Sequence, residues 1–534
     1  MERDLIQALV RVPRGDGTGG DASLMRALAA DLGLEFDPLD CTLSARWDGP
    51  RPAALQDVSA ETWRSTGDTV ERIELLSAAL ISGDVNAGDE NTGKENAGDW
   101  PQTRAVIAEI EARVRPVLRA SGPAEEEGLL TALSGRFVAP APSGAPTRGR
   151  LDVLPTGRNF FSVDSRAVPT PTAWALGWKS ANLLIERHLQ DHGDWPRALL
   201  LSAWGTANMR TGGDDIAQAM ALMGVRPQWD SANRRVTGFE ILPLSVLARP
   251  RVDVTFRVSG FFRDAFPHQI DLLDSAARAV QALDEPEDQN PAAGRARAGN
   301  DPARVFGAKP GAYGAGLQAM IDERLWERRE DLAEAYLAWG SFAYGGGAEG
   351  AEKRPALEAQ LSAVDAIVQN QDNREHDILD SDDYYQFEGG AAATVAALQG
   401  RDRPIYHNDH SRPETPRIRT LDEEISRVMR SRVVNPKWIN GVMRHGYKGA
   451  FEMAATLDYL FAFAATTGAV KNHHFDLIHA AYLEDTAVRD FIEESNPDAL
   501  REMAARLSEA ITRGLWVPRS NSARGAIEAL LQGR

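Results

Sequence analysis

The residues best suited to chemistry in this chain lie in one acidic stretch, Val368 to Gly390. Carboxylate oxygen and imidazole nitrogen are ligands that divalent metals accept, so this stretch could bind, transfer or dehydrate a metal ion. The alternative is an exposed acidic loop. Tyr384, Tyr385 and Phe387 favour partial burial, because aromatic side chains need burial and buried carboxylates need partners or raised pKa values. The acidic and imidazole side chains of the stretch are Asp372, Glu375, His376, Asp377, Asp380, Asp382, Asp383 and Glu388.

A second group of metal-binding residue types follows in the motif Tyr406-H-N-D-H, which holds His407, Asp409 and His410. These side chains are close enough in sequence to enter one site from a loop. Histidines with a structural role in a polar turn are the alternative, and the nearby acidic stretch favours the metal site. The predicted metal ligands are His376, Asp380, His407 and His410.

Two loops carry side chains that could bind a ligand carboxylate. Trp204 to Asp215 contains several glycines, the polar Asn208 and the cationic Arg210, and it leads into a helix N-terminus, which favours anions. An ordinary capped, glycine-rich turn explains the same pattern. The second loop places Arg263 beside a Phe-Phe pair, although core packing accounts equally well for the phenylalanines.

A basic and aromatic patch stands out near the carboxyl end of this acidic chain. The segment from Val433 to Ala450 is interrupted by a proline and contains Lys437, Trp438 and Arg444. It could bind ligand carboxylates or a protein partner, and simple packing is the alternative for Trp438. We predict Asn208, Arg210, Arg263 and Lys437 as substrate-binding residues.

The elements that must position these residues alternate between strands and helices. The apolar run 197–203 predicts a strand, 214–223 has helical spacing, and further strands are expected at 239–244 and 252–258. Pro267 suits the start of another helix. The fold class is therefore α/β, with ligand loops beyond the carboxyl ends of the strands.

Helical regions flank this centre, so we predict a mixed multidomain chain. Apolar residues recur at helical spacing before residue 81, and Thr420 begins a capping box before a mostly helical region that ends near Trp516. His188, His192, His473 and His474 are expected to be solvated. Surface loops are predicted at 83–99, 285–304 and 345–354. The predicted regions are 1–135, helical with a mobile loop at 83–99; 136–345, α/β and ligand-binding; 346–420, an acidic site region rich in His and Asp; and 421–534, helical.

Composition excludes several classes of protein. The chain has 534 residues, of which 43% are hydrophobic, and a formal net charge of −18, so a nucleic-acid role is improbable. No apolar run approaches the roughly 18 residues that a membrane helix needs. A single cysteine, Cys41, excludes an intramolecular disulfide and fits a reducing cytoplasm. Phosphate-loop and serine-hydrolase motifs are absent from the sequence, so ATP is not assigned to this chain.

Several long strings in the chain resemble a known family, the large subunit of aerobic ATP-dependent cobaltochelatase, CobN, which is related to the H subunit of magnesium chelatase. The strings occupy 157–170, 201–216, 260–267, 306–316, 369–387 and 434–438. They include LSAWGTANMRTGGDDI, GFFRDAFP and QNQDNREHDILDSDDYYQF. The resemblance implies insertion of cobalt(II) into a corrin-type tetrapyrrole, hydrogenobyrinic acid a,c-diamide, during cobalamin synthesis. It also implies that 136–345 is the tetrapyrrole-binding region.

The resemblance also implies partners. ATP, with Mg, would be hydrolysed by separate AAA+ and adaptor subunits of the CobS and CobT type. The family's large subunit is about twice as long, so we expect this chain to correspond to its carboxy-terminal half and to need a separate amino-terminal half. The alternatives are a magnesium chelatase H-type subunit acting on protoporphyrin IX and a noncatalytic fragment that docks the AAA+ subunits.

A chelatase must remove water from the metal ion, distort the macrocycle and accept two pyrrole protons, and carboxylates and imidazoles are suited to the metal and proton steps. We therefore expect the metal-handling or proton-accepting groups in the acidic stretch and the binders of the peripheral carboxylates among the cationic residues named above. The predicted catalytic residues are Glu375, His376, Asp377, Asp380 and Asp382.

Overall fold

A computed structural model describes residues 2–11, 23–39, 41–85, 100–142, 151–161, 163–231, 234–374, 376–413 and 415–532. Most of the loop predicted at 83–99, and the candidate Glu375, lie outside the described residues. The chain divides into two compact units, Met1–Asp164 and Ser165–Arg534. The first unit contains most of the predicted helical region, and the second contains all the candidate site residues.

The first unit is helical, as predicted. Helix α4 shows why: it begins at a capping box between Ser65 and Asp68 and ends at Gly83, whose φ of 77° suits glycine. Leu28, Ile73 and Val114 lie in its fully buried core. Its elements are α1 (Glu2–Arg11), α2 (Leu24–Asp31), α3 (Ala53–Gln56), α4 (Thr66–Ser82), α5 (Pro101–Glu109), η1 (Ile110–Val114), α6 (Arg115–Leu133), β1 (Ala141–Pro142), η3 (Leu151–Val153) and β2 (Asn159–Phe161).

The second unit is built on an eight-stranded sheet with the order β12-β11-β10-β3-β6-β7-β8-β9. The strands from β11 to β7 in this order run parallel, and β12, β8 and β9 pair antiparallel with their neighbours. The strands are β3 (Ala198–Ala203), β6 (Asp253–Val258), β7 (Val305–Gly307), β8 (Phe342–Gly345), β9 (Ala348–Glu352), β10 (Ala366–Gln371), β11 (Ile405–Asp409) and β12 (Arg417–Thr420).

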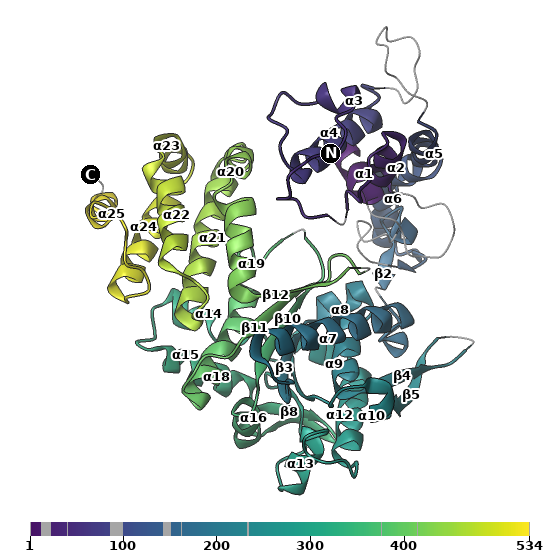
Figure 1. Ribbon diagram of the computed structural model, residues 1–534, viewed down its shortest axis with the longest axis vertical. Coiled ribbons are helices and arrows are strands. Elements are labelled where there is room, and N and C mark those ends of the chain that lie inside the picture. The colour runs from purple at the N-terminus through teal and green to yellow at the C-terminus, as the bar shows by residue number, and fades with distance from the viewer. Residues whose placement is uncertain are drawn as a thin grey trace. The chain divides into compact units, whose positions relative to one another are not determined.

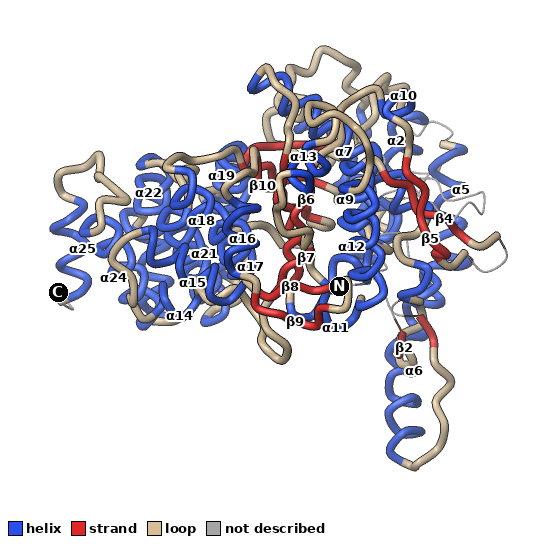
Figure 2. The backbone as a smooth tube through the Cα atoms, turned by 90° about the horizontal axis from the view of Figure 1, so that it is seen from below, coloured by secondary structure: helices blue, strands red, loops and turns tan. Residues whose placement is uncertain are grey.

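Helices cover both faces of this sheet (Figures 1 and 2). Every residue of β3, β6 and β10 is buried, as expected for parallel strands between two helical layers. On one face lie α7 (Pro171–His192), α9 (Asp214–Met223) and α12 (Pro267–Gln281); on the other lie α15 (Arg329–Gly340), α16 (Arg354–Leu361) and α18 (Gly390–Gln399). The predicted α/β class and the helix start at Pro267 are confirmed.

The carboxyl-terminal part of this unit is a group of helices packed beside the sheet (Figure 1). The predicted capping box is confirmed: Thr420 Oγ1 accepts a hydrogen bond from the Glu423 amide, and Glu423 accepts one from the Thr420 amide. Met453, Leu457 and Phe461 are buried. The elements are α19 (Leu421–Val428), η6 (Met429–Val433), α20 (Pro436–Met443), α21 (Tyr447–Thr466), α22 (Asn472–Ile478), η7 (His479–Glu484), α23 (Thr486–Ser495), α24 (Pro497–Thr512) and α25 (Ala523–Leu531).

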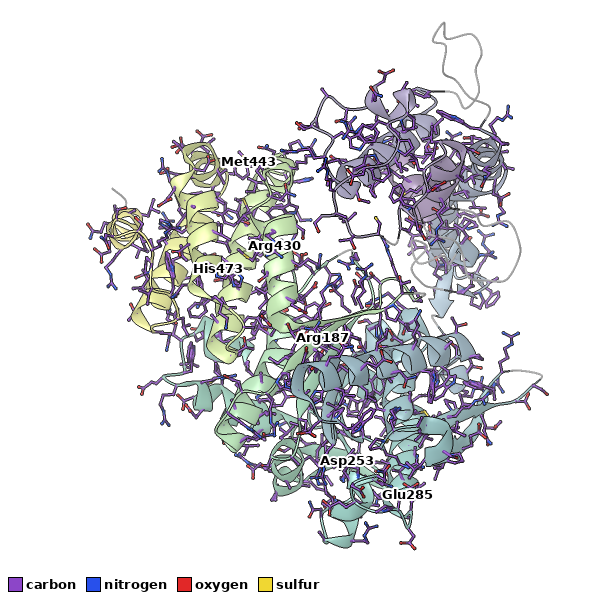
Figure 3. The ribbon with its side chains drawn as sticks, viewed as in Figure 1. Arg187, Asp253, Glu285, Arg430, Met443 and His473 are labelled. Carbon is purple, nitrogen blue, oxygen red and sulfur yellow. The ribbon has the colours of Figure 1, made fainter. Side chains whose placement is uncertain are left out.

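One local prediction is shifted and two are wrong. The strand expected at 239–244 is present three residues earlier as β5 (Val236–Ile241), and it pairs with β4 (Val225–Trp229) in a separate hairpin outside the main sheet. Residues 345–354 form the turn and second strand of the β8–β9 hairpin. Residues 285–304 contain α13 (Pro291–Arg297) and are held by ion pairs, among them Glu285 with Arg251 and Asp253 with Arg304. Polar composition therefore does not make this segment a solvated loop. Figure 3 labels Asp253 and Glu285.

Two of the four histidines expected to be solvated are buried. His188 is 5% exposed and His474 is 1% exposed, whereas their neighbours His192 and His473 are exposed. Burial lowers the pKa of both His188 and His474 to about 4. Within the described part of the chain, helices with the length and apolar character needed to cross a membrane are absent.

Candidate functional site at the carboxyl edge of the sheet

The candidate residues gather where the parallel strands end. In the sheet order, β6 and β7 lie on one side of β3, and the later strands β10 and β11 lie on the other. The direction of winding therefore changes between β3 and β10, and ligands of open α/β sheets bind outside the carboxyl ends of the strands at such a point. The loops that follow β3, β6, β7, β10 and β11 include most of the strings singled out in the sequence.

An ion pair joins the two loops at this point. Arg210, in helix α8 (Gly205–Thr211), contacts the Asp372 carboxylate, with Nε to Oδ2 at 2.8 Å and Nη2 to Oδ1 at 2.9 Å. The Asp372 side chain is 6% exposed and that of Arg210 is 29% exposed. Two parallel hydrogen bonds of this kind fix both position and orientation. The Arg210 side chain is therefore partly exposed at the predicted ligand edge.

Asn208, in the same helix as Arg210, is fully buried. Its Nδ2 donates to Asp215 Oδ2 at 2.7 Å and to the Trp204 carbonyl at 2.9 Å. Asn370 Nδ2 donates to the other Asp215 oxygen at 2.8 Å. Burial, and then the neighbouring Asp214, raise the pKa of Asp215. The structure therefore places the predicted substrate-binding Asn208 in a buried network that supports the loop.

His410 belongs to the same buried network. Its Nε2 lies 2.7 Å from Ser180 Oγ, and its Nδ1 lies 2.9 Å from Asp214 Oδ2. This is the order of a serine, histidine and aspartate triad. However, each of the three residues is at most 1% exposed, and Ser180 Oγ also accepts a hydrogen bond from Gln218, so the hydroxyl is not presented to a substrate. The arrangement ties the end of β11 to α7 and α9.

His407 lies on the opposite face of the sheet, because side chains alternate along β11. Its Nδ1 is 3.2 Å from Glu388 Oε2 and its Nε2 is 3.2 Å from Gln371 Oε1. Glu388 is in the π-helix η5 (Tyr385–Gly389), which follows α17 (Asp382–Tyr384), and both His407 and Glu388 are 0% exposed. The Tyr384 ring lies 5.5 Å from that of His407. Tyr384, Tyr385 and Phe387 are buried, as predicted.

The centre of the acidic stretch is clamped to helix η6 by one arginine. Arg432 contacts Asp377 through Nε at 2.7 Å and Nη2 at 2.9 Å, and its Nη1 is 3.0 Å from Asp380. Burial, and then the charge of Asp377, raise the pKa of Asp380. The half-buried His376 is on the same loop, and its carbonyl accepts a hydrogen bond from Gln371 at 2.6 Å. The structure thus brings His376, Asp377 and Asp380 together on one loop.

Asp382 faces a small acidic cavity of about 150 Å³ between the end of this stretch and α21. Burial raises the pKa values of Asp322 and Asp458 in its wall, and it raises the pKa of Tyr459 to about 12. Asp382 accepts a hydrogen bond from Gln386 at 2.9 Å. The cavity is lined by Gln318, Ile321, Asp322, Asp382, Tyr385, Phe451, Ala454, Ala455, Asp458, Tyr459, Ala462 and Glu502.

Arg263, in α11 (Gly260–Ala265), holds the glycine-rich loop after β7. Its Nη1 donates to the carbonyls of Ala308, Lys309 and Ala312 at 3.2, 2.7 and 3.1 Å. The guanidinium also pairs with Asp264, and it is 7% exposed. These contacts occupy the predicted substrate-binding arginine with the loop itself.

Lys437 lies apart from the strand ends, in the first turn of α20. It lines an open groove of about 500 Å³ with Trp438 and Lys448. Arg432 provides the connection to the acidic stretch, because its guanidinium carbon lies 5.1 Å from the centre of the Trp438 ring. The basic patch expected from the sequence is therefore a groove on the far side of Arg432 from Asp377.

The four predicted metal ligands occupy three different environments. His407 contacts Glu388, His410 contacts Asp214, and His376 and Asp380 lie on the 376–383 loop. Within the described ranges, which exclude Glu375, the structure contains no group of three or more histidine, cysteine or acidic residues arranged to hold a metal ion. Metal ligation by these residues stays a prediction.

Sequence reasoning missed Asp214 and Arg432, which contact His410 and Asp377. Glu388 was named among the acids of the stretch, but its contact with His407 was not predicted. No local pattern pairs Arg432 with an aspartate 55 positions earlier, but the count of acids in the stretch was a signal that cations from elsewhere must approach it.

A mostly parallel, doubly covered sheet with charged loops at one edge defines an α/β protein whose ligand site is expected at that edge. Residues 1–523 match a family model described as CobN/Magnesium Chelatase, and the chain belongs to this family.

Individual relatives agree with this assignment. The chain is 61% identical to the aerobic cobaltochelatase subunit CobN of Sinorhizobium sp over 98% of its length, and 56% identical to that of Pseudomonas aeruginosa over 99%. It covers 43% of each of these proteins. The solved catalytic subunit of cobaltochelatase from Mycobacterium tuberculosis matches 100% of the chain with a TM-score of 0.86 and 42% identity, and the match covers 44% of that structure. The chain therefore spans less than half the length of these relatives.

Proposed function

We propose that the chain forms part of a cobaltochelatase large subunit and takes part in inserting cobalt(II) into hydrogenobyrinic acid a,c-diamide in cobalamin synthesis. The main support is that the sequence motifs shared with this family lie mainly on loops at one edge of the sheet. These loops surround the point between β3 and β10 where the direction of winding changes. Family membership supports chelation, and the loops supply side chains of suitable chemistry.

The proposed chemistry divides between the two sides of this edge. A metal ion entering a macrocycle exchanges water for pyrrole nitrogen, and the two pyrrole protons must pass to a base. Asp380 is our candidate base, because a raised pKa makes a carboxylate a better proton acceptor. His376 and Asp377 lie beside it, and Glu375 precedes them in the chain.

Arg210 is the candidate for binding the peripheral carboxylates of the macrocycle. Its side chain is 29% exposed at the edge of the sheet, and a guanidinium suits carboxylate binding. Arg263 acts in this proposal through the 308–312 loop that it holds. Cobalt is a substrate ion here, and ATP with Mg is hydrolysed by AAA+ and adaptor partners of the CobS and CobT type, in keeping with a sequence that lacks a phosphate-loop motif.

A spectral titration tests the proposal. The chain, supplied with the remaining portion of a large subunit from a relative, is titrated with hydrogenobyrinic acid a,c-diamide and separately with protoporphyrin IX. We expect saturable binding of the corrin and, after addition of the ATPase partners, ATP and cobalt(II), the absorbance change of metal insertion. Preferential binding of protoporphyrin with insertion of magnesium would establish the magnesium chelatase alternative instead.

A control addresses the possibility of a docking fragment. Partner ATPases are immobilised and the chain alone is applied, in parallel with a corrin titration of the same chain. Partner binding without any tetrapyrrole binding, in both the isolated and the supplemented chain, would support docking and contradict the chelatase proposal.

A further inference from the structure

The groove beside Lys437 is lined mainly by basic and aromatic side chains. We call it the basic groove and define it by Lys437, Trp438, Arg444, His445 and Lys448. Gly441, Val442 and Glu452 complete its lining, and its volume is about 500 Å³. It lies between α20, whose last residue Met443 is labelled in Figure 3, and the start of α21.

The charge of the basic groove is opposite to that of the chain. Its lining contains three permanently cationic side chains, Lys437, Arg444 and Lys448, and one carboxylate, Glu452, whereas the whole chain has a formal net charge of −18. Lys437 and Lys448 are in the first turns of α20 and α21, where the helix dipoles add positive potential. Glu452 lies 3.8 Å from Lys448, which is 77% exposed and accessible to another anion.

An exposed aromatic residue adjoins the groove in sequence. Tyr447, which directly precedes the groove residue Lys448, is 67% exposed. Trp438 forms part of the groove wall. Aromatic residues and arginine are enriched where proteins bind other proteins. A small free anion would gain no binding free energy from this apolar surface. The combination fits a peptide that carries both carboxylates and apolar side chains.

A tetrapyrrole fits this surface less well. The groove is open to solvent, whereas small-molecule sites enclose most of the ligand surface. A macrocycle could place a carboxylate on Lys437 but would leave its faces in water. A peptide in an extended or helical conformation can instead run along the groove and contact Lys437 and Lys448 together.

The groove also contacts the candidate site through one residue. Arg432 stacks on Trp438, with 5.1 Å from its guanidinium carbon to the ring centre. The same guanidinium holds Asp377 at 2.7 Å and Asp380 at 3.0 Å. A displacement of Trp438 therefore acts directly on the group that clamps the acidic stretch.

We propose that the basic groove binds a glutamate- or aspartate-rich peptide segment of a partner protein, and that Trp438 and Arg432 couple this binding to the 376–383 loop. The inference goes beyond the proposed function, because it assigns a partner surface that does not depend on which metal or macrocycle is used.

The test uses the full chain and a defined probe. A fluorescein-labelled peptide of glutamates interrupted by phenylalanines is titrated by fluorescence anisotropy, with a matched peptide in which glutamine replaces glutamate. We expect saturable binding of the glutamate peptide that weakens with added salt. The Lys437→Glu, Lys448→Glu double variant should bind it at least about tenfold more weakly, since like charges repel the probe.

The matched control is the double variant Arg519→Glu, Arg524→Glu, which reverses the charge of two exposed arginines outside the groove. It should bind the peptide as the unmodified chain does. Equal loss in both double variants would show a general charge effect and overturn the proposal. So would equal binding of the glutamine peptide, or displacement of the probe by hydrogenobyrinic acid a,c-diamide through Lys437, which would assign the groove to the macrocycle.

Hydrogen exchange tests the coupling. Saturation with the glutamate peptide should change the exchange of amides in 376–383 in the unmodified chain. The Trp438→Leu variant keeps an apolar wall but removes the stacking surface, so it should bind the peptide and lose the change at 376–383. A change that persists in Trp438→Leu, or is absent in the unmodified chain, would overturn the coupling.

Discussion

The carboxylates of the acidic stretch differ by their surroundings. Asp372 and Asp377 each accept two hydrogen bonds from one guanidinium, so their charges are neutralised where they lie. The pKa values of the Asp380 and Asp383 carboxyl groups are raised, chiefly by burial and then by the charge of a neighbouring aspartate. The first pair fixes the shape of the loop, and the second pair is better suited to accept a proton.

Replacing Asp380 with Asn tests the proton-accepting role. The substitution keeps the volume and removes the charge, so chelation by the reconstituted complex should fall by at least about tenfold, equivalent to roughly 1.4 kcal/mol of barrier. Corrin binding and the unfolding midpoint should change little. Chelation is followed by the absorbance change on cobalt insertion. Asp490→Asn, at an exposed aspartate in α23, is the matched control. Normal rates in both Asp380→Asn and His376→Ala would exclude this loop from the chemistry.

The buried histidines predict a pH dependence of stability. The pKa values of His188 and His474 fall from 6.5 to about 4, so the unfolded chain binds more protons between these values. The free energy of unfolding should therefore fall as the pH decreases from 6.5 toward 4, by about 2 kcal/mol per histidine near pH 5.

Urea unfolding near pH 7 and near pH 5 measures this effect. The His188→Gln, His474→Gln double variant should lose less stability between the two conditions than the unmodified chain. The exposed His268 provides a control away from both sites, since His268→Gln should leave the pH dependence nearly unchanged. An unaltered slope in the first double variant would contradict the assignment.

At the scale of elements, two loops that follow strands of the sheet are each held by an arginine from a helix. The loop after β7 is held by Arg263 from α11, and the loop after β10 by Arg432 from η6. A Cβ on Gly260 would lie 2.8 Å from the Ala312 carbonyl oxygen, so α11 and this loop are in close contact. The loops at the edge are therefore positioned by helices as much as by their own strands.

Arg263→Lys tests whether that support matters more than direct ligand contact. Lysine keeps the charge but lacks the planar fork that reaches three carbonyls, so amides in 308–313 should exchange faster and corrin affinity should fall several-fold. Exposed Arg524→Lys serves as the control. Reduced corrin affinity with unchanged exchange would instead mean that Arg263 contacts the ligand itself.

The strands and helices of the central region could be predicted because periodicity and caps are local. The buried run at β3, the helix at 214–223 and the capping box at Thr420 are examples. Which residues come together in the site was harder to predict from the sequence. Asn208 and Arg210 are two residues apart, yet Asn208 is buried in a hydrogen-bond network and Arg210 is partly exposed at the edge of the sheet. The β8–β9 hairpin and α13 were missed because their polar residues gain partners only in the fold.

At the scale of the whole molecule, each compact unit has its own apolar core. Leu28, at 0% exposure, belongs to a cluster within the first unit, and Leu457, at 1% exposure, belongs to one within the second. A unit with its own core can unfold as one cooperative step. Stability therefore has to be considered separately for Met1–Asp164 and Ser165–Arg534.

Two leucine substitutions test this independence. Removing buried methyl groups costs about 2–5 kcal/mol, because the surrounding side chains only partly fill the cavity. We expect two calorimetric transitions, with Leu28→Ala lowering the midpoint of one and Leu457→Ala lowering the midpoint of the other. The exposed leucines Leu129 and Leu531 provide a control in each unit, where alanine should leave both midpoints nearly unchanged. If either core substitution lowered both transitions equally, the units would be one cooperative body, and groove binding, corrin binding and stability could not be assigned to Ser165–Arg534 alone.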